Sequence, residues 1–150
     1  MEKLFYKLNT ANEKQINLHL EKCKEFFVPP LDQTVAIDEY ANRIFKNSIT
    51  FEAWVDQALV GLIAAYYNDF DKYVGYITNV SVDQSMKGQR VATVMMEHCI
   101  QYAKENYFKA IRLEVNQHNE AALQLYKKFN FIETDSKKDS ILMELDISKI

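Results

Sequence analysis

The stretch that most constrains the fold runs from Tyr76 to Ala103, where a strand pattern changes into a helix pattern across a tight turn. Residues Tyr76–Val82 alternate with period two and are rich in β-branched side chains, which predicts a strand. From Val91 onward, apolar residues recur at helical spacing. A strand that enters a helix in this way leaves the N–H groups of the first helical turn unpaired at the positive end of the helix dipole. The turn therefore predicts an anion site that suits a phosphate group.

Residues 1–150 are predicted to form a single compact domain. A hydrophobic content of 48% with 13% aromatic residues is sufficient for one core and argues against disorder. The net charge of −3 gives no reason to expect nucleic-acid binding, and the apolar runs are too short to span a membrane. Cys23 and Cys99 fall within apolar helical patterns, which predicts buried reduced thiols and a cytoplasmic protein.

The remaining elements follow from the same two periodicities. Besides 76–82, the predicted strands are 5–8, 49–55, 59–67, 110–115, 131–134 and 141–146, and the predicted helices are 11–26, 36–45, 91–106 and 119–129. The order β-α-α-β-β-β-α-β-α-β-β predicts one mixed α/β sheet with helices on both faces. In the first helix, Asn9 and Thr10 are the expected cap, and Leu18 is expected to point inward.

Two features outside this pattern bear on function. The segment Phe26–Leu31 is apolar, but its paired prolines exclude a regular helix. It is therefore either a buried corner between two helices or an apolar lip over a substrate pocket, and both interpretations stay open. The histidines His19, His98 and His118 are isolated in the sequence, so we expect them on the solvated surface and expect no metal site.

The segment Val80–Met96 is close to a known pattern: Gln or Arg, two residues, Gly, one residue, then Gly or Ala. Lys87 takes its first position, Arg90 stands where glycine is usual, and Ala92 takes the last. If the backbone at residue 90 is helical, as the neighbouring residues predict, the guanidinium can contact phosphate oxygens. A positive φ at this residue would instead weaken cofactor binding.

The segment 113–126 carries a second pattern, in which an Asn opens a helix that contains Ala and ends on Leu-Tyr. Asn119 and Tyr126 take these positions, and Asn130-Phe131 follows where Gly-Phe is usual. With these two segments and its order of elements, the chain resembles the GNAT family of N-acetyltransferases over nearly its whole length. The resemblance implies the GNAT fold and a co-substrate, acetyl-CoA, that donates its acetyl group to an amine.

The resemblance also implies roles for individual residues. It assigns the pantetheine and the thioester oxygen to the strand amides of Val80, Ser81 and Val82. The implied pyrophosphate cradle consists of Lys87, Gly88, Gln89, Arg90, Val91, Ala92 and Thr93. Tyr126 matches the usual general acid, which reprotonates the departing thiolate, and Asn119 contacts the cofactor or simply caps its helix.

Glu114 matches the proton acceptor of some protein N-terminal acetyltransferases of the family. A carboxylate beside a buried strand is a plausible base, but Glu114 could equally pair with Arg112 or Lys109 at the surface. Phe27, Tyr66 and Asn79, with Tyr67 and Asn68, are weaker candidates for acceptor binding.

The acceptor expected from the sequence is the primary amine of a small molecule. A protein or peptide N-terminus is the alternative acceptor, which Glu114 favours. A non-catalytic module that binds coenzyme A is the third hypothesis, which Arg90 favours. The exposed ends of a mixed sheet also leave a homodimer open.

Overall fold

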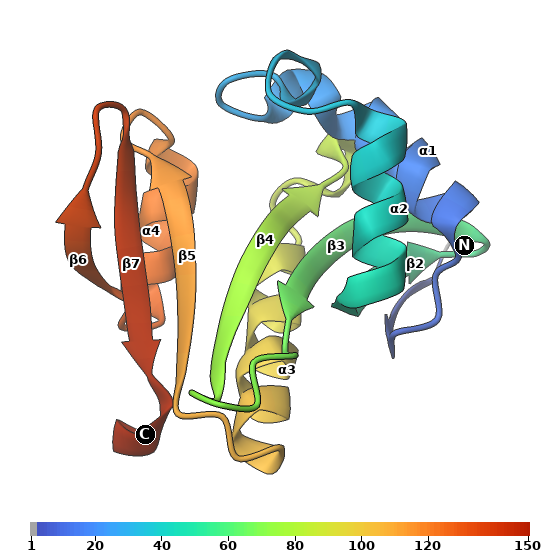
Figure 1. Cartoon of the computed structure of the whole chain (residues 1–150). Helices are drawn as coiled ribbons and strands as arrows, with labels where there is room; N and C mark the ends of the chain where they lie inside the picture. The colour runs from blue at the N-terminus through green and yellow to red at the C-terminus, as the bar shows by residue number, and fades with distance from the viewer. Residues whose placement is uncertain (1–2) are drawn as a thin grey trace.

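A computed structural model, which describes residues 3–150, contains a seven-stranded mixed sheet with helices on both faces (Figure 1). The elements are β1 (Leu4–Leu8), α1 (Glu13–Cys23), α2 (Ile37–Asn47), β2 (Ile49–Val55), β3 (Ala58–Tyr66), β4 (Val74–Val82), α3 (Val91–Glu105), β5 (Ala110–Asn116), α4 (Glu120–Lys128), β6 (Ile132–Ser136) and β7 (Ser140–Asp146). Across the sheet the strands lie in the order β1-β2-β3-β4-β5-β7-β6. β4 and β5 are parallel, and the other neighbours are antiparallel. The predicted order of elements and the mixed sheet are confirmed.

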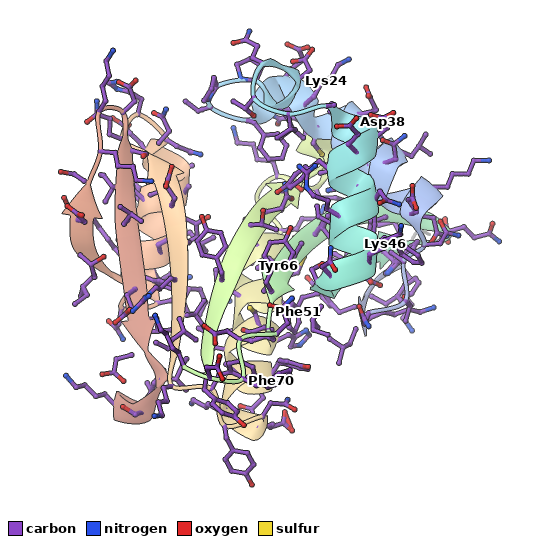
Figure 2. All side chains as sticks on the ribbon, in the orientation of Figure 1. Lys24, Asp38, Lys46, Phe51, Tyr66 and Phe70 are labelled. Atoms are coloured by element: carbon purple, nitrogen blue, oxygen red, sulfur yellow. The ribbon has the colours of Figure 1, made fainter. Side chains whose placement is uncertain are left out.

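Each face of the sheet has its own apolar core. On one face, α3 and α4 pack on the strands around Phe51, Met95 and Leu113. On the other face, α1 and α2 bury Ile16, Leu20, Ile44 and their neighbours. Figure 2 shows Asp38 and Lys46 directed outward from α2, whereas Phe51 lies inside the molecule. Among residues 3–150, no helix combines the length and the apolar character needed to cross a bilayer.

The start of α1 differs from the prediction. The N-cap is Asn12, whose Oδ1 accepts a hydrogen bond from Gln15 N, and the Gln15 side chain accepts one from Asn12 N. This reciprocal pair is a capping box, which satisfies two helix-end donors and so displaces Asn9 and Thr10 as the cap. Leu18 is 68% exposed, because it lies off the stripe of buried residues that begins at Ile16.

Thr10 instead contacts a buried carboxylate on β2. Glu52 is 1% exposed, and its two oxygens accept five hydrogen bonds. The donors are Thr10 N, Thr10 Oγ1, Ala11 N, Thr50 Oγ1 and Trp54 Nε1. A buried charge is tolerated when hydrogen bonds replace its hydration, so Glu52 joins the β1–α1 connection to the sheet.

Candidate active site

The candidate site lies where β4 and β5 separate. These parallel strands pair from Val74–Ala110 to Ile77–Leu113 and then diverge (Figure 1). In the part of the chain that the structure describes, Thr78–Val82 have no ladder partner on β5. Backbone groups of a strand that lack a ladder partner are strong hydrogen-bonding groups that need another one. We call the gap between Thr78–Val82 and β5 the β4–β5 opening.

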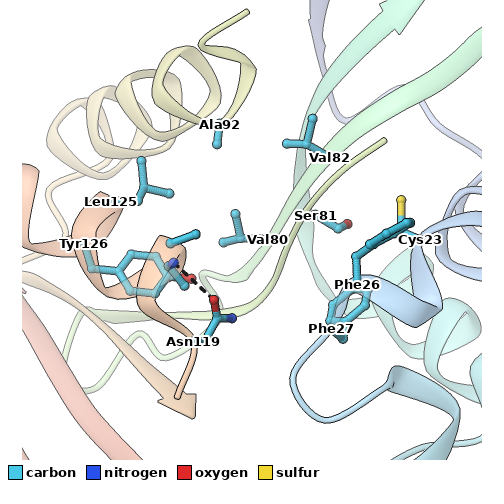
Figure 3. A pocket seen from close by; sticks show the side chains of 12 residues that line it. Cys23, Phe26, Phe27, Val80, Ser81, Val82, Ala92, Asn119, Leu125 and Tyr126 are labelled. Carbon is cyan, nitrogen blue, oxygen red and sulfur yellow. Dashed lines mark hydrogen bonds between the residues drawn. The ribbon is translucent and has the colours of Figure 1, made fainter. Parts of the chain in front are cut away.

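A cavity of about 350 Å³ occupies one side of the β4–β5 opening (Figure 3). Its lining residues are Cys23, Phe26, Phe27, Val80, Ser81, Val82, Ala92, Asn119, Ala121, Ala122, Leu125 and Tyr126. A smaller cavity of about 130 Å³ lies beside it and shares Phe27, Val80, Asn119 and Tyr126 as walls. The smaller cavity is also lined by Thr78, Asn79 and Glu114. We call them the large and the small cavity; Tyr126 lines both.

Tyr126 lies on α4 and belongs to the same core as Ile111 and Leu113 of β5. Its ring is buried, 5.7 Å from the ring of Phe131 between centroids. Burial raises the pKa of Tyr126 above its ordinary value, because a phenolate would lose its hydration there. The phenol therefore stays protonated at neutral pH, which is the state that a proton donor needs. The two interpretations of Tyr126, core residue and acid, are compatible.

Asn119 is the N-cap of α4 and lines both cavities. Its Oδ1 accepts a hydrogen bond from Ala122 N at 3.2 Å (Figure 3). The predicted capping role is confirmed, and the cofactor contact remains a prediction. Ala122 and Leu125 line the large cavity from the same helix, although the sequence analysis did not select them. Their spacing in the sequence could have identified them. Ala122 lies three residues before Leu125 and four before Tyr126, so the three side chains lie on one side of the helix.

The start of α3 corrects one expectation. Arg90 is the N-cap in the left-handed conformation, with φ 59° and ψ 28°, so the predicted helical torsion is wrong. This conformation is natural for glycine and costs roughly 1–2 kcal/mol for other residues. Arg90 thus has the positive φ for which the sequence analysis expected weaker cofactor binding, and that weakening stays a prediction. Its side chain is exposed, and Ala92 rather than Arg90 lines the large cavity.

The predicted phosphate cradle consists of exposed and buried parts. Lys87, Gly88 and Gln89 are exposed, and Gly88 has φ 85°. Val91 and Thr93 point into the core, so only their backbone N–H groups could serve a ligand. Within residues 3–150, no side chain caps α3. The first-turn N–H groups are therefore open to an anion, as the fit of a diphosphate requires.

Glu114 lies on the side of β5 that faces the small cavity. Its oxygens lie 3.2 Å from Lys137 Nζ and 3.1 Å from Ser140 Oγ. The expected pairing with Arg112 or Lys109 is wrong, since Arg112 Nε bonds Glu144 Oε1 at 2.6 Å instead. The position of Glu114 at the small cavity agrees with a role as general base, which stays a prediction.

The candidates for acceptor binding do not all lie together. Phe27 lines both cavities and Asn79 the small one, whereas Tyr66 and Asn68 line a separate 520 Å³ hollow at the paired end of β4. Tyr67 lies in the core, where its hydroxyl donates to Cys99 O at 3.1 Å. It does not border the site.

The segment from Phe26 to Leu31 combines both interpretations that the sequence left open. It is irregular, as predicted, with a cis peptide bond between Val28 and Pro29. Leu31 is buried in the core formed by α1 and α2. Phe26 and Phe27, in contrast, line the large cavity, and Phe26 is 56% exposed. One end of the segment is a corner, and the other end is an apolar lip.

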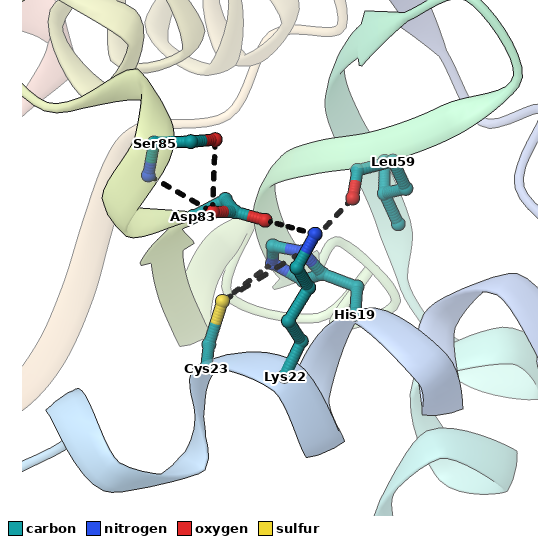
Figure 4. Close-up of polar contacts among 6 residues, drawn as sticks. All are labelled: His19, Lys22, Cys23, Leu59, Asp83 and Ser85. Carbon is teal, nitrogen blue, oxygen red and sulfur yellow. Dashed lines mark hydrogen bonds and ion pairs between the residues drawn. The ribbon is translucent and has the colours of Figure 1, made fainter.

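His19 is buried, against the expectation of a solvated side chain. Its Nδ1 lies 3.2 Å from Leu59 O (Figure 4). Its Nε2 lies 2.9 Å from Ser81 Oγ. Burial lowers the pKa of His19 to about 4, so the ring is neutral at neutral pH. A neutral ring with both nitrogens in contact holds α1 on β3 and β4. The buried thiol of Cys23, 3.8 Å from the ring nitrogens, lies on the cavity wall as a result.

An ion pair beside His19 fixes the end of β4. Lys22 Nζ lies 2.8 Å from Asp83 Oδ2, and Ser85 N and Oγ donate to Asp83 Oδ1 at 3.0 Å (Figure 4). Burial acts to raise the pKa of Asp83, but Lys22 and Ser85 outweigh it and hold the pKa below its ordinary value. These contacts anchor the turn that leads into α3.

Comparisons with known proteins agree with this geometry. The sequence model of the acetyltransferase (GNAT) family matches residues 12–131. A probable N-acetyltransferase, san, from Drosophila melanogaster is 31% identical over an alignment of 113 positions, which covers 63% of this chain and 60% of that protein. The [ribosomal protein bS18]-alanine N-acetyltransferase of Escherichia coli K12 is 31% identical over an alignment of 80 positions, which covers 47% of this chain and 54% of that protein.

Among solved structures, the PaiA N-acetyltransferase from Thermoplasma acidophilum in complex with coenzyme A has a TM-score of 0.73. It is 12% identical, and the match covers 95% of this chain and 99% of that one. This likeness shows a shared fold. The chain spans only about half to 60% of the length of the two sequence relatives. The match of the family model over most of the chain shows that it belongs to the acetyltransferase (GNAT) family.

Proposed function

We propose that this protein transfers the acetyl group of acetyl-CoA to the primary amine of a small molecule, by direct attack in a ternary complex. The observation that carries the proposal is that Tyr126 lines both the large and the small cavity. Two adjacent cavities would hold donor and acceptor at the same time, so that the amine attacks the thioester without a covalent enzyme intermediate.

The large cavity is the proposed site of the pantetheine, between β4 and the α4 face. The open first turn of α3, with Lys87 beside it, would hold the diphosphate. Acetyl-CoA supplies the acetyl group as a thioester. Backbone N–H groups of Val80–Val82 that face the β4–β5 opening would stabilise negative charge on the thioester oxygen.

Two side chains of this chain complete the proton balance. A neutral amine forms the new N–C bond while the S–C bond breaks. Glu114 accepts the proton that the amine loses, directly or through water, and Tyr126 donates a proton to the departing sulfur. Glu114 and Tyr126 both line the small cavity, so both reach the reacting groups from its walls.

The size of the small cavity supports a small acceptor. Its volume of 130 Å³ holds roughly four water-sized groups at about 30 Å³ each, enough for an amine and the atoms next to it. A peptide N-terminus is the second candidate, and the position of Glu114 on the cavity wall favours it. A thiol-release assay with acetyl-CoA and a panel of small amines and short peptides separates the two.

The test of the mechanism is Tyr126→Phe, which removes only the hydroxyl. We expect turnover to fall about 100-fold, since general acids contribute roughly that much or more, with acetyl-CoA affinity nearly unchanged by calorimetry. Tyr67→Phe, which removes a hydroxyl buried away from both cavities, is the matched control. Unchanged turnover in Tyr126→Phe would reject its role as acid. Absence of acetyl-CoA binding by the unaltered protein would reject the function itself.

A further inference from the structure

Thr78 lies where two irregularities of the sheet coincide. In the β3–β4 pairing, Ala64 is opposite Asn79 and Ala65 is opposite Ile77, so Thr78 is the extra residue of a β-bulge. In the β4–β5 pairing, the last pair is Ile77–Leu113, directly before the same residue. Bulges bend a strand and disrupt its ladder locally. The bulge at Thr78 therefore lies at the point where β4 turns away from β5.

A side chain from α2 supplies the bulge with a hydrogen-bond partner. The hydroxyl of Tyr40 donates to Thr78 O at 2.6 Å and lies 2.9 Å from Thr78 Oγ1. A carbonyl that a bulge removes from the ladder costs about 1–3 kcal/mol if it is buried without a partner. Burial raises the pKa of Tyr40, so its hydroxyl stays protonated and able to donate. This hydroxyl therefore supplies the carbonyl of Thr78 with a hydrogen-bond donor.

The position of the Tyr40 hydroxyl is itself well fixed. Tyr40 is 6% exposed, and Ile37, Ala41 and Ile44 of the same helix are buried in the core on that face of the sheet. The guanidinium of Arg43 lies 5.6 Å from the Tyr40 ring centroid. A packed side chain has few rotamers available. The bulge is thus held from the α1–α2 face, opposite the face that α3 and α4 cover.

We propose that Tyr40 is a positioning residue that holds the bulge at Thr78 and so sets the width of the β4–β5 opening for acetyl-CoA. The proposal rests on the proposed function, since it concerns the same site. Tyr40 touches neither substrate; it acts through Thr78. Without its hydroxyl, the carbonyl of Thr78 loses its partner, and the strand relaxes toward a regular ladder with a narrower opening.

The experiment compares two buried tyrosines that each donate one hydrogen bond to a backbone carbonyl. Tyr40→Phe removes the bond to Thr78 O, and Tyr67→Phe removes the bond to Cys99 O in α3. We expect the Kd for acetyl-CoA, measured by calorimetry, to rise about three- to tenfold in Tyr40→Phe and less than about twofold in Tyr67→Phe. Amide hydrogen exchange of Thr78–Val82 should become faster in Tyr40→Phe alone.

Two results would overturn the proposal. One is an acetyl-CoA affinity in Tyr40→Phe equal to that of the unaltered protein. The other is an equal loss in both variants, which would reflect general softening of the fold and not positioning. If the unaltered protein binds no acetyl-CoA, the proposed function fails, and the exchange rates of Thr78–Val82 still show whether Tyr40 holds the bulge.

Discussion

Two carboxylates on strands, Glu52 on β2 and Glu114 on β5, occupy opposite kinds of environment. Glu52 is buried and accepts five hydrogen bonds, three of them from the β1–α1 connection. Glu114 is partly exposed at the small cavity, with one lysine and one serine as partners. A carboxylate that is saturated by fixed donors has no capacity left for a proton in transit. The difference indicates that Glu52 stabilises the fold, whereas Glu114 is available for chemistry.

The comparison first predicts a large loss of stability at Glu52. In Glu52→Gln, an amide NH₂ replaces one oxygen and faces donors such as Thr10 N, Ala11 N or Trp54 Nε1. We expect a loss of about 3 kcal/mol in the free energy of unfolding, or roughly 6–12 °C in Tm, measured by denaturant and thermal unfolding. Glu133→Gln, at an exposed position of β6, is the control and should change stability by less than about 0.5 kcal/mol. Equal stability of Glu52→Gln and Glu133→Gln would contradict the structural role of Glu52.

The second prediction concerns Glu114, where we expect a large loss of activity and little loss of stability. Glu114→Gln keeps the shape but cannot accept the amine proton, so turnover should fall about 100-fold. Unfolding free energy should change by less than about 0.5 kcal/mol, because the lost ion pair with Lys137 is exposed. Thiol-release kinetics and thermal unfolding of the same preparation give both values. Full turnover in this variant would remove Glu114 from the mechanism and leave the amine to lose its proton to water.

The smallest effect is expected at Lys137. Lys137→Met removes the flexible partner of Glu114 but leaves Ser140 Oγ in place. Turnover should stay within about threefold and unfolding free energy within about 0.5 kcal/mol, since exposed ion pairs contribute little. A fall to the level of Glu114→Gln would mean that the lysine, not the carboxylate alone, is essential at the cavity wall.

The regular part of the fold could be predicted from the sequence because its signals are local. Period-two runs such as Tyr76–Val82 and helical stripes such as Val91–Ala103 indicate which side chains are buried, and that periodicity identifies the element. Tyr126 was selected because the segment 113–126 resembles the second GNAT pattern, in which Asn119 opens the helix and Tyr126 ends it. Both signals depend only on residues close together in the chain.

The features that the sequence did not predict depend mainly on contacts between elements that are far apart in the chain. Alternation continues through Thr78 and hides the bulge, whose carbonyl has its partner in Tyr40 of α2, 38 residues away. His19 was expected at the surface because its partners, Leu59 and Ser81, are 40 and 62 residues away. Leu18 was assigned inward on its apolarity, although its spacing from Ile16 opposes that assignment.

β4 and β5 pair over only four residues at one end, so a rotation about the paired end at Ile77 displaces the unpaired end of β4 the most. From Ile77 to Val82 the strand extends about 16 Å at roughly 3.3 Å per residue. A rotation of about 5° at the pivot therefore moves the far end by roughly 1.4 Å, about half a hydrogen-bond length. Because Ser81 and Val82 also pair with Leu62 and Gly61, such a rotation would carry β3 and β4 together, so that a small movement at the Val74–Ala110 end is enlarged at Val82.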